Sequence, residues 1–214
     1  MGYITYIDLI KDYLGNQEVV STGMTREIER CRKAVELAVA GRSVAVISSG
    51  DPGVYGMAGL VLEIMEAEQL LGAMPVEIIP GITSATASAA KLGAPLMHDF
   101  AVISLSDLLT PWEVIAKRLE AAAQADFVIV LYNPASKKRT WQIEQAREIL
   151  LKYKPPATPV GIVKNAAREE ESLIITNLRE LPDQPVDMLS TVIVGNRSTR
   201  RAGDFMITPR GYRV

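Results

Sequence analysis

The sequence has little of what several common classes of protein need. Its 214 residues include one cysteine and one histidine, so no disulfide can form within the chain and no set of Cys and His ligands can hold a metal. Lys and Arg number 23 against 25 Asp and Glu, a net charge of −2. This balance argues against nucleic acid as a main partner, because non-specific binding to phosphates needs a basic field. Cys31 lies in a helical pattern and is interpreted as a small buried residue.

Features of membrane proteins and of common nucleotide enzymes are also missing. No apolar run approaches the length that spans a bilayer, and the first residues show no secretory pattern. We therefore expect a cytoplasmic protein with no membrane partner and no bound metal. Neither G-x-x-x-x-G-K-[ST] nor G-x-G-x-x-G follows an expected strand, so a P-loop nucleotidase and a Rossmann dinucleotide enzyme have no support.

What the sequence does contain is a regular alternation of helix-like and strand-like segments. In the first half, helices are predicted at 25–41, 57–72 and 84–93, and strands at 43–48, 76–80 and 100–107. Thr83 or Ser84 is the expected cap of the third helix. Alternation of this kind predicts parallel strands joined by right-handed crossovers.

Thr110-Pro111 is typical of the start of a helix and marks the expected boundary between two lobes. After that helix, a strand (127–133), a helix (140–153) and another strand (159–164) are followed by apolar runs separated by polar turns. Such runs favour antiparallel pairing. The predicted fold is α/β with two lobes: residues 1–109 with a mainly parallel sheet and helices, and residues 110–214 with a mixed sheet.

Two loops at expected strand ends are candidates for ligand binding. "SSGDPG" (48–53) and "PGITSA" (80–85) each follow an apolar run, and ligands of open α/β sheets bind at the carboxyl ends of strands. Asp51 would repel a phosphate, whereas it suits a ligand with a positive centre. The alternative is that Gly50–Gly53 make only a tight turn.

Several separated motifs together resemble the tetrapyrrole methylase family. They are "SSGDPGVYGMAG", "PGITSATASAAKLGAPLMHDFAVISLSDLLTPWE", "LYNPASKKR" and "VGNRSTRR...MITPRGY". The resemblance covers nearly the whole chain, and the last two motifs with "MHDFAVISLSDLLTPW" are similar to the branch that methylates C-17. It implies S-adenosylmethionine as methyl donor, a precorrin-3B or cobalt-factor III type tetrapyrrole as acceptor, ring contraction in cobalamin biosynthesis, and a homodimer.

The resemblance also carries cofactor contacts onto the matching positions of this chain. They are Ser49, Gly50, Asp51, Val54, Thr83, Ser84, Tyr132, Asn133, Asn165 and Thr191. The last four rest on looser matches. The chain opens with "MGYITYIDLI", which is similar to the family segment after a first strand and a Gly-x-Gly-Pro-Gly loop, so we expect the first lobe to lack that strand.

Two basic clusters follow expected strand ends. They consist of Lys137, Lys138 and Arg139, and of Arg197, Arg200 and Arg201. A uroporphyrinoid carries many acetate and propionate arms, and an arginine fork pairs with a carboxylate through two hydrogen bonds. The clusters are therefore candidate substrate clamps, with a solvated basic face as the alternative.

Ring contraction requires a group that handles a proton or a hydroxyl. His98, Ser104 and Asp107 are polar residues near one expected strand, and the sequence does not choose among them. An imidazole titrates near neutrality, although a lone histidine before a strand is also typical of a structural residue. Two other functions stay open: a tetrapyrrole methylase acting at another carbon, and a non-catalytic tetrapyrrole-binding protein.

Overall fold

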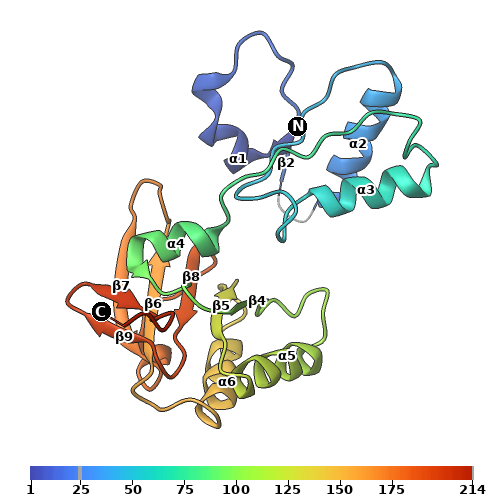
Figure 1. Cartoon of the computed structure of the whole chain (residues 1–214). Coiled ribbons are helices and arrows are strands. Elements are labelled where there is room, and N and C mark those ends of the chain that lie inside the picture. Colours follow the sequence, from blue (N-terminus) through green and yellow to red (C-terminus); the bar gives the residue numbers. More distant parts are fainter. Residues whose placement is uncertain (24–25, 214) are drawn as a thin grey trace. The chain divides into compact units, whose positions relative to one another are not determined.

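The computed structural model describes residues 1–23 and 26–213. The chain forms two compact units, Met1–Thr83 and Ser84–Val214 (Figure 1). The predicted boundary after residue 109 lies inside the second unit. The reason is that β4 (Phe100–Ser104), which the sequence groups with the first lobe, pairs along its whole length with β5 (Val128–Tyr132) of the second.

The first unit is mainly helical. Its elements are β1 (Gly2–Tyr3), α1 (Ile4–Leu9), the 3₁₀ helix η1 (Lys11–Tyr13), β2 (Ser21–Thr22), α2 (Glu27–Val39) and α3 (Ala58–Ala67). Cys31 and Val35 of α2 pack against Ile64 and Met65 of α3. Cys31 is fully buried, and burial raises the pKa of its thiol, which confirms its interpretation as a core residue. Thr25, with which the predicted helix starts, lies outside the described residues.

Parallel pairing in the first unit is limited in extent. β1 and β2 pair in parallel, and Gly2 forms a parallel bridge to Ile47. Within the described residues, the predicted strands at 43–48 and 76–80 have no further strand pairing. Ile78 and Ile79 are 45% and 64% exposed. Strand propensity alone did not make these two segments into strands, because a strand needs a neighbouring strand to bind its backbone N–H and C=O groups.

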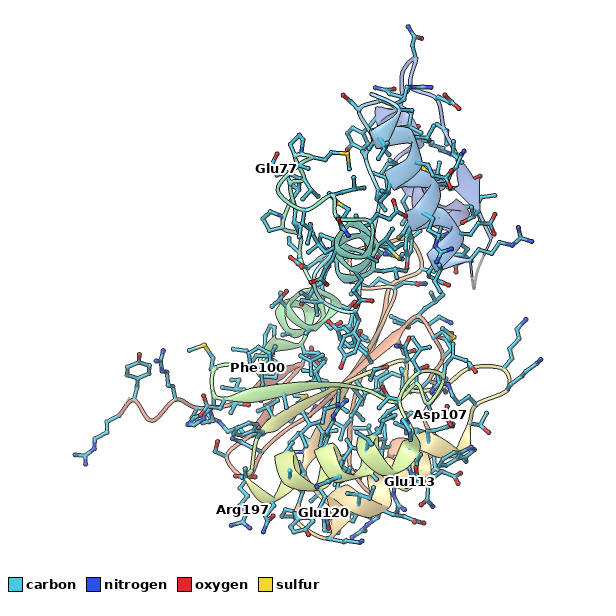
Figure 2. The ribbon with its side chains drawn as sticks, turned by 90° about the vertical axis from the view of Figure 1, so that its right-hand side faces the viewer. Glu77, Phe100, Asp107, Glu113, Glu120 and Arg197 are labelled. Carbon is cyan, nitrogen blue, oxygen red and sulfur yellow. The ribbon has the colours of Figure 1, made fainter. Side chains whose placement is uncertain are left out.

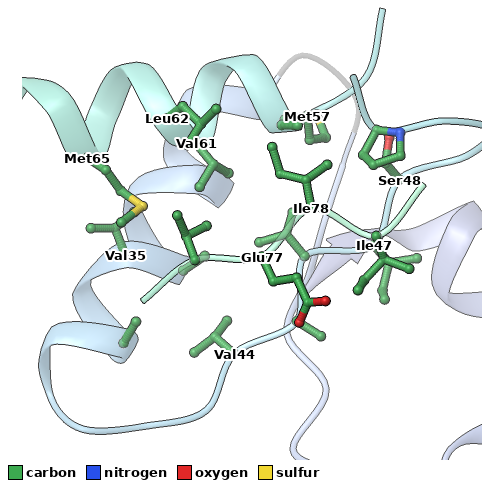
Figure 3. A pocket seen from close by; sticks show the side chains of 18 of the residues that line it. Val35, Val44, Ile47, Ser48, Met57, Val61, Leu62, Met65, Glu77 and Ile78 are labelled. Carbon is green, nitrogen blue, oxygen red and sulfur yellow. The ribbon is translucent and has the colours of Figure 1, made fainter. Parts of the chain in front are cut away.

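These two segments line an apolar cavity. Its volume is about 490 Å³, and its walls come from the segments 43–48 and 74–79 and from the facing sides of α2 and α3. Figure 3 shows Val35, Met65 and Ile78 around this space. The packed contact between α2 and α3 thus lies beside this apolar cavity.

The second unit contains a mixed sheet of five strands in the order β4-β5-β8-β6-β7, as the sequence predicts. The remaining strands of this sheet are β6 (Pro159–Lys164), β7 (Ser172–Asn177) and β8 (Ser190–Val194). β4 and β5 are parallel, and β8 runs antiparallel to both β5 and β6. β4, β5 and β6 therefore point the same way, and their carboxyl ends lie at one edge of the sheet, called the carboxyl edge below.

Both faces of this sheet are covered. The covering elements are α4 (Ser84–Leu92), β3 (Gly93–Ala94), α5 (Trp112–Gln124), α6 (Trp141–Leu151), the 3₁₀ helix η2 (Leu181–Asp183), β9 (Arg200–Ala202) and β10 (Phe205–Ile207). Helices α5 and α6 pack on one face, with Ile129 and Leu131 in the shared core. Helix α4 and Met206 of β10 pack on the other face with Val128 and Val130. The central strands β5, β8 and β6 are thus buried on both sides, while the outer strands β4 and β7 stay partly exposed.

Two close contacts fix the layers of the second unit. A Cβ at Gly161 of β6 would lie 2.4 Å from a methyl carbon of Leu92 and 2.9 Å from the sulfur of Met206, so only glycine lets α4 and β10 approach this strand. On the opposite face, the rings of Trp112 and Trp141 meet edge to face with centroids 4.9 Å apart. That contact joins the first turns of α5 and α6. No helix of the described residues is both long and apolar enough to cross a membrane.

Candidate active site

The two glycine-rich loops of the first unit are held together by Asp51. Its Oδ1 accepts the N–H of Gly53 at 2.8 Å and its Oδ2 accepts the N–H of Gly81 at 3.0 Å. These bonds, the one to Gly81 first, lower the pKa of the Asp51 carboxyl. A Cβ at Gly81 would lie 2.2 Å from the carbonyl oxygen of Gly50. The loops are therefore in direct contact, and the Gly-Asp-Pro segment does more than make a tight turn.

This geometry changes the role expected for Asp51. Both carboxylate oxygens accept hydrogen bonds from backbone N–H groups. The side chain therefore stabilises the arrangement of the two loops. Val54 donates its N–H to the carbonyl of Asp51 at 3.1 Å and closes the turn. Ser49, Gly50, Asp51 and Val54 thus belong to one structured turn, while Thr83 is the last residue of the first unit.

The carboxyl edge of the second unit brings together the looser cofactor matches. Tyr132 ends β5, Asn133 follows it, and Asn165 follows β6. Thr191 pairs with Val163 near the start of β8 at the same edge. The Tyr132 hydroxyl accepts the N–H of Ala85 at 2.8 Å. It thereby reaches the first turn of α4, where Ser84 lies, so five predicted contacts share one region: Ser84, Tyr132, Asn133, Asn165 and Thr191.

Two asparagines of this edge have left-handed backbone. The φ angles are 50° at Asn133 and 53° at Asn165, a conformation that asparagine tolerates better than most residues. The Nδ2 of Asn133 donates to the Oγ of Ser104 at 3.0 Å, and the N–H of Asn165 donates to the carbonyl of Leu189 at 3.1 Å. The edge therefore offers uncharged amide and hydroxyl groups, which suit the hydroxyl and amino groups of a small polar ligand.

The three proton-handling candidates do not form one cluster. His98 precedes β4 and Ser104 ends it, so the two lie about 20 Å apart along the strand. Figure 2 shows Phe100 and Asp107 toward opposite ends of β4. The Nδ1 of His98 accepts the N–H of Asp99 at 2.9 Å. His98 lines a separate cavity at the amino end of β4, which leaves Ser104 and Asp107 at the carboxyl edge.

The first basic cluster divides into two parts. Ser136 and Arg139 exchange backbone hydrogen bonds of 2.8 and 3.2 Å, which places Lys137 and Lys138 at the exposed tip of a turn. Arg139 points the other way. Its Nη1 donates to the carbonyl oxygens of Leu105 at 3.0 Å and Asn133 at 2.8 Å. One nitrogen of the Arg139 guanidinium, Nη1, is therefore bound to the protein backbone, while its role as a substrate clamp stays a prediction.

The second basic cluster is also dispersed. The N–H of Arg197 donates to both carboxylate oxygens of Asp126 at 3.2 and 3.3 Å, at the amino end of β5 and so opposite the carboxyl edge. Arg201 of β9 donates to the carbonyl oxygens of Gly203 at 2.9 Å and Ile175 at 3.2 Å. Arg200 is exposed on the same strand. The role of these three residues as a substrate clamp stays a prediction.

Gln142 is a buried polar residue in contact with a candidate site residue, and the sequence analysis missed it. Its side chain is buried, and Nε2 donates to Oδ2 of Asp107 at 3.1 Å. Its Oε1 has no hydrogen-bond partner among the described residues. The sequence contains a signal for the burial of Gln142, because this residue has helical spacing with the buried Ala146 and Leu150. In the described part of the chain, no three His, Cys, Asp or Glu side chains gather as metal ligands.

The chain is similar to known proteins over most of its length. The model of the family described as Tetrapyrrole (Corrin/Porphyrin) Methylases matches residues 7–182. A cobalt-factor III methyltransferase of Priestia megaterium is 55% identical over 99% of this chain, which spans 40% of that protein. A probable cobalt-factor III C(17)-methyltransferase of Salmonella typhimurium is 54% identical over 99% of this chain and 87% of that protein. The crystal structure of the methyltransferase CobJ superposes with a TM-score of 0.89 at 39% identity, covering 97% of this chain and 87% of that one.

Proposed function

Because the chain belongs to the tetrapyrrole methylases, we propose that it methylates C-17 of a cobalt-factor III or precorrin-3B type tetrapyrrole, with ring contraction, in cobalamin biosynthesis. One observation carries this proposal. The Salmonella relative, a probable C(17)-methyltransferase, is 54% identical over almost the entire chain. The family alone would equally allow a methylase acting at another carbon.

S-adenosylmethionine is the proposed methyl donor. It supplies a methyl group that its sulfonium already activates, so the protein needs mainly to align donor and acceptor and to exclude water. In the second unit the residues proposed to hold it are Ser84, Tyr132, Asn133, Asn165 and Thr191. Their uncharged hydrogen-bonding groups suit a ligand rich in hydroxyl and amino groups. In the first unit the proposed contacts are the turn Ser49–Val54 and Thr83, with Asp51 holding the turn in shape.

The acceptor contacts are proposed for the basic side chains that the structure leaves exposed. Lys137 and Lys138 lie at the tip of the turn beyond β5, and Arg200 is exposed on β9. Each can pair with an acetate or propionate arm without first giving up a bond that shapes the fold. Arg139 and Arg201, whose guanidinium groups bind backbone carbonyls, are less suited to this task.

The proton or hydroxyl step of ring contraction is proposed for Ser104 or Asp107. Both lie at the carboxyl edge, near Asn133. The Oγ of Ser104 accepts hydrogen bonds from the amide of Asn133 and from the N–H of Ser106, which hold this hydroxyl in a defined position at the strand end. Asp107 keeps one carboxylate oxygen in addition to the one that Gln142 binds. His98, at the other end of β4, is a poorer candidate.

A homodimer and a cytoplasmic location complete the proposal. The homodimer follows from the family resemblance, and the location from the single cysteine and the composition. Sedimentation equilibrium of the purified chain tests the first, and fractionation of cells that express it tests the second.

The decisive experiment supplies the chain with cobalt-factor III or precorrin-3B and methyl-labelled S-adenosylmethionine. Label at C-17 together with a contracted ring supports the proposal. Label at another carbon identifies the first alternative, and macrocycle binding without label transfer identifies a non-catalytic binding protein. A Ser104→Ala variant sharpens the result, since loss of contraction with retained labelling assigns the hydroxyl to that step.

A further inference from the structure

We propose that Arg139 is a positioning residue that fixes the carboxyl ends of β4 and β5 for donor binding, while Lys137 and Lys138 alone present the charge of this cluster to the acceptor. The inference rests on the proposed function and deepens it. Within one basic cluster, it assigns positioning of the strand ends to Arg139 and acceptor binding to the two lysines.

The argument starts where the two strands stop pairing. β4 and β5 are in parallel register up to Ser104 and Tyr132, and the N–H of Leu105 adds one more bond to the carbonyl of Tyr132 at 2.9 Å. One step further, at Leu105 and Asn133, two carbonyl oxygens remain at the strand ends. Two acceptors cannot bond to each other, so an external donor is required.

Arg139 supplies that donor. A single nitrogen, Nη1, bonds to both carbonyl oxygens, at 3.0 Å for Leu105 and 2.8 Å for Asn133. A charged donor makes stronger hydrogen bonds than a neutral one. Arg139 thereby continues the connection between the strands beyond the point at which the regular ladder ends.

The bond to Asn133 matters most, because this residue has a left-handed backbone with φ of 50°. That conformation is costly for a residue other than glycine and persists only where its surroundings hold it. Two contacts hold it here, the one from Arg139 to its carbonyl and the one from its own amide to Ser104. Removing Arg139 should let the peptide after Asn133 rotate and so move the group proposed to bind the donor.

The surroundings of Arg139 support a fixed side chain. Burial lowers the pKa of its guanidinium while the carboxylate of Asp107 raises it, and Asp107 is itself bound by the buried Gln142. Lys137 and Lys138 have no such setting, since both are exposed at the tip of the turn. The same three-residue cluster therefore contains one side chain held by the fold and two directed to solvent.

The test compares Arg139→Met with a matched Lys137→Met/Lys138→Met double variant. Affinity for the demethylated donor S-adenosylhomocysteine is measured by calorimetry, and KM for the tetrapyrrole by label transfer. Loss of two charge-assisted bonds should weaken donor binding of Arg139→Met at least tenfold, with KM for the acceptor nearly unchanged. The double variant should show the opposite pattern. Unchanged donor affinity together with a raised acceptor KM in Arg139→Met would overturn the inference and make Arg139 a direct clamp.

Amide hydrogen exchange provides a readout that does not depend on the ligand. The amides of Leu105 and Ser136 should exchange faster in Arg139→Met and at the wild-type rate in the lysine double variant. If the wild-type chain binds no S-adenosylhomocysteine, the proposed donor is wrong, but the exchange result still decides whether Arg139 orders the strand ends. Should Arg139→Met fail to fold, Arg139→Lys replaces it. A lysine is one atom shorter and keeps the charge, so a direct clamp predicts wild-type donor affinity and exchange, whereas positioning predicts a change in both.

Discussion

The two units support their strand-end loops in different ways. In the second unit, Ser104 ends β4 and Asn133 follows the buried strand β5, and the two strands are paired in register. In the first unit, the segment before the loop at Gly50 has a single bridge, from Ile47 to Gly2, and the segment before Gly81 has no strand pairing in the described residues. Asp51 ties these two loops together. The sheet therefore fixes the loops of the second unit, whereas the loops of the first unit depend largely on the carboxylate of Asp51. Disturbed packing should therefore affect mainly the second unit, and removal of the Asp51 carboxylate should affect mainly the first.

The largest effect is expected from Gly161→Val, which tests the close packing of the second unit. The new Cβ would overlap Leu92 and Met206, and a packed interior yields little, so the free energy of unfolding should fall by about 3 kcal/mol. Chemical denaturation followed by tryptophan fluorescence measures it. A change below about 1 kcal/mol would show that α4 and β10 can move away from the sheet, against the rigid support assigned to this unit.

Asp51→Ala tests the contact between the two loops of the first unit. Without its carboxylate, the N–H groups of Gly53 and Gly81 lose their acceptors, and the two loops should separate. We expect donor affinity to fall about tenfold or more, while the unfolding midpoint of the second unit stays unchanged. Calorimetric titration with S-adenosylhomocysteine gives the affinity. An equal loss in the control Glu63→Ala, an acidic residue of α3, would show that charge rather than loop geometry matters.

A pH titration sharpens the role of the same carboxylate. Because backbone hydrogen bonds lower the pKa of Asp51 in the folded state from its ordinary value of 3.8, their stabilisation is fully present above pH 3.8 and is lost as the pH falls through the lower folded value. The amide resonance of Gly81 should therefore shift with a midpoint below 3.8. A midpoint above it would mean that the two loops are not joined by this side chain in solution. Asp51→Asn removes the titration.

The smallest effect is expected at Gly59 of α3. A Cβ there meets nothing within 4 Å, so alanine can take the helical conformation without strain and restricts the unfolded chain more than glycine does. Gly59→Ala should stabilise the first unit by about 0.5 kcal/mol. Thermal unfolding followed by circular dichroism reports it. A destabilising result would indicate that this helix surface is covered in solution, contrary to its exposure in the structure.

The sequence predicts the family, the α/β class and most element types, since these depend on spacing and on motifs that persist along the chain. It places the boundary between units too late, because pairing between Phe100–Ser104 and Val128–Tyr132 is a long-range contact with no local signal. It also groups His98 with Ser104, since neighbours in sequence can lie at opposite ends of a strand. The roles of Arg139 and Asp51 depend on which backbone groups lack a partner, and only a structure shows that.

The contact between Trp112 and Trp141 has a spectroscopic consequence. The chain contains only these two tryptophans, and they pack edge to face at the start of α5 and α6, next to Gln142. Intrinsic tryptophan emission therefore monitors the second unit and its carboxyl edge, and it carries no signal from Met1–Thr83. An unfolding curve read by emission that coincides with one read by backbone circular dichroism would mean that both units melt as one cooperative system. Separate curves would give each unit its own transition without any label being added.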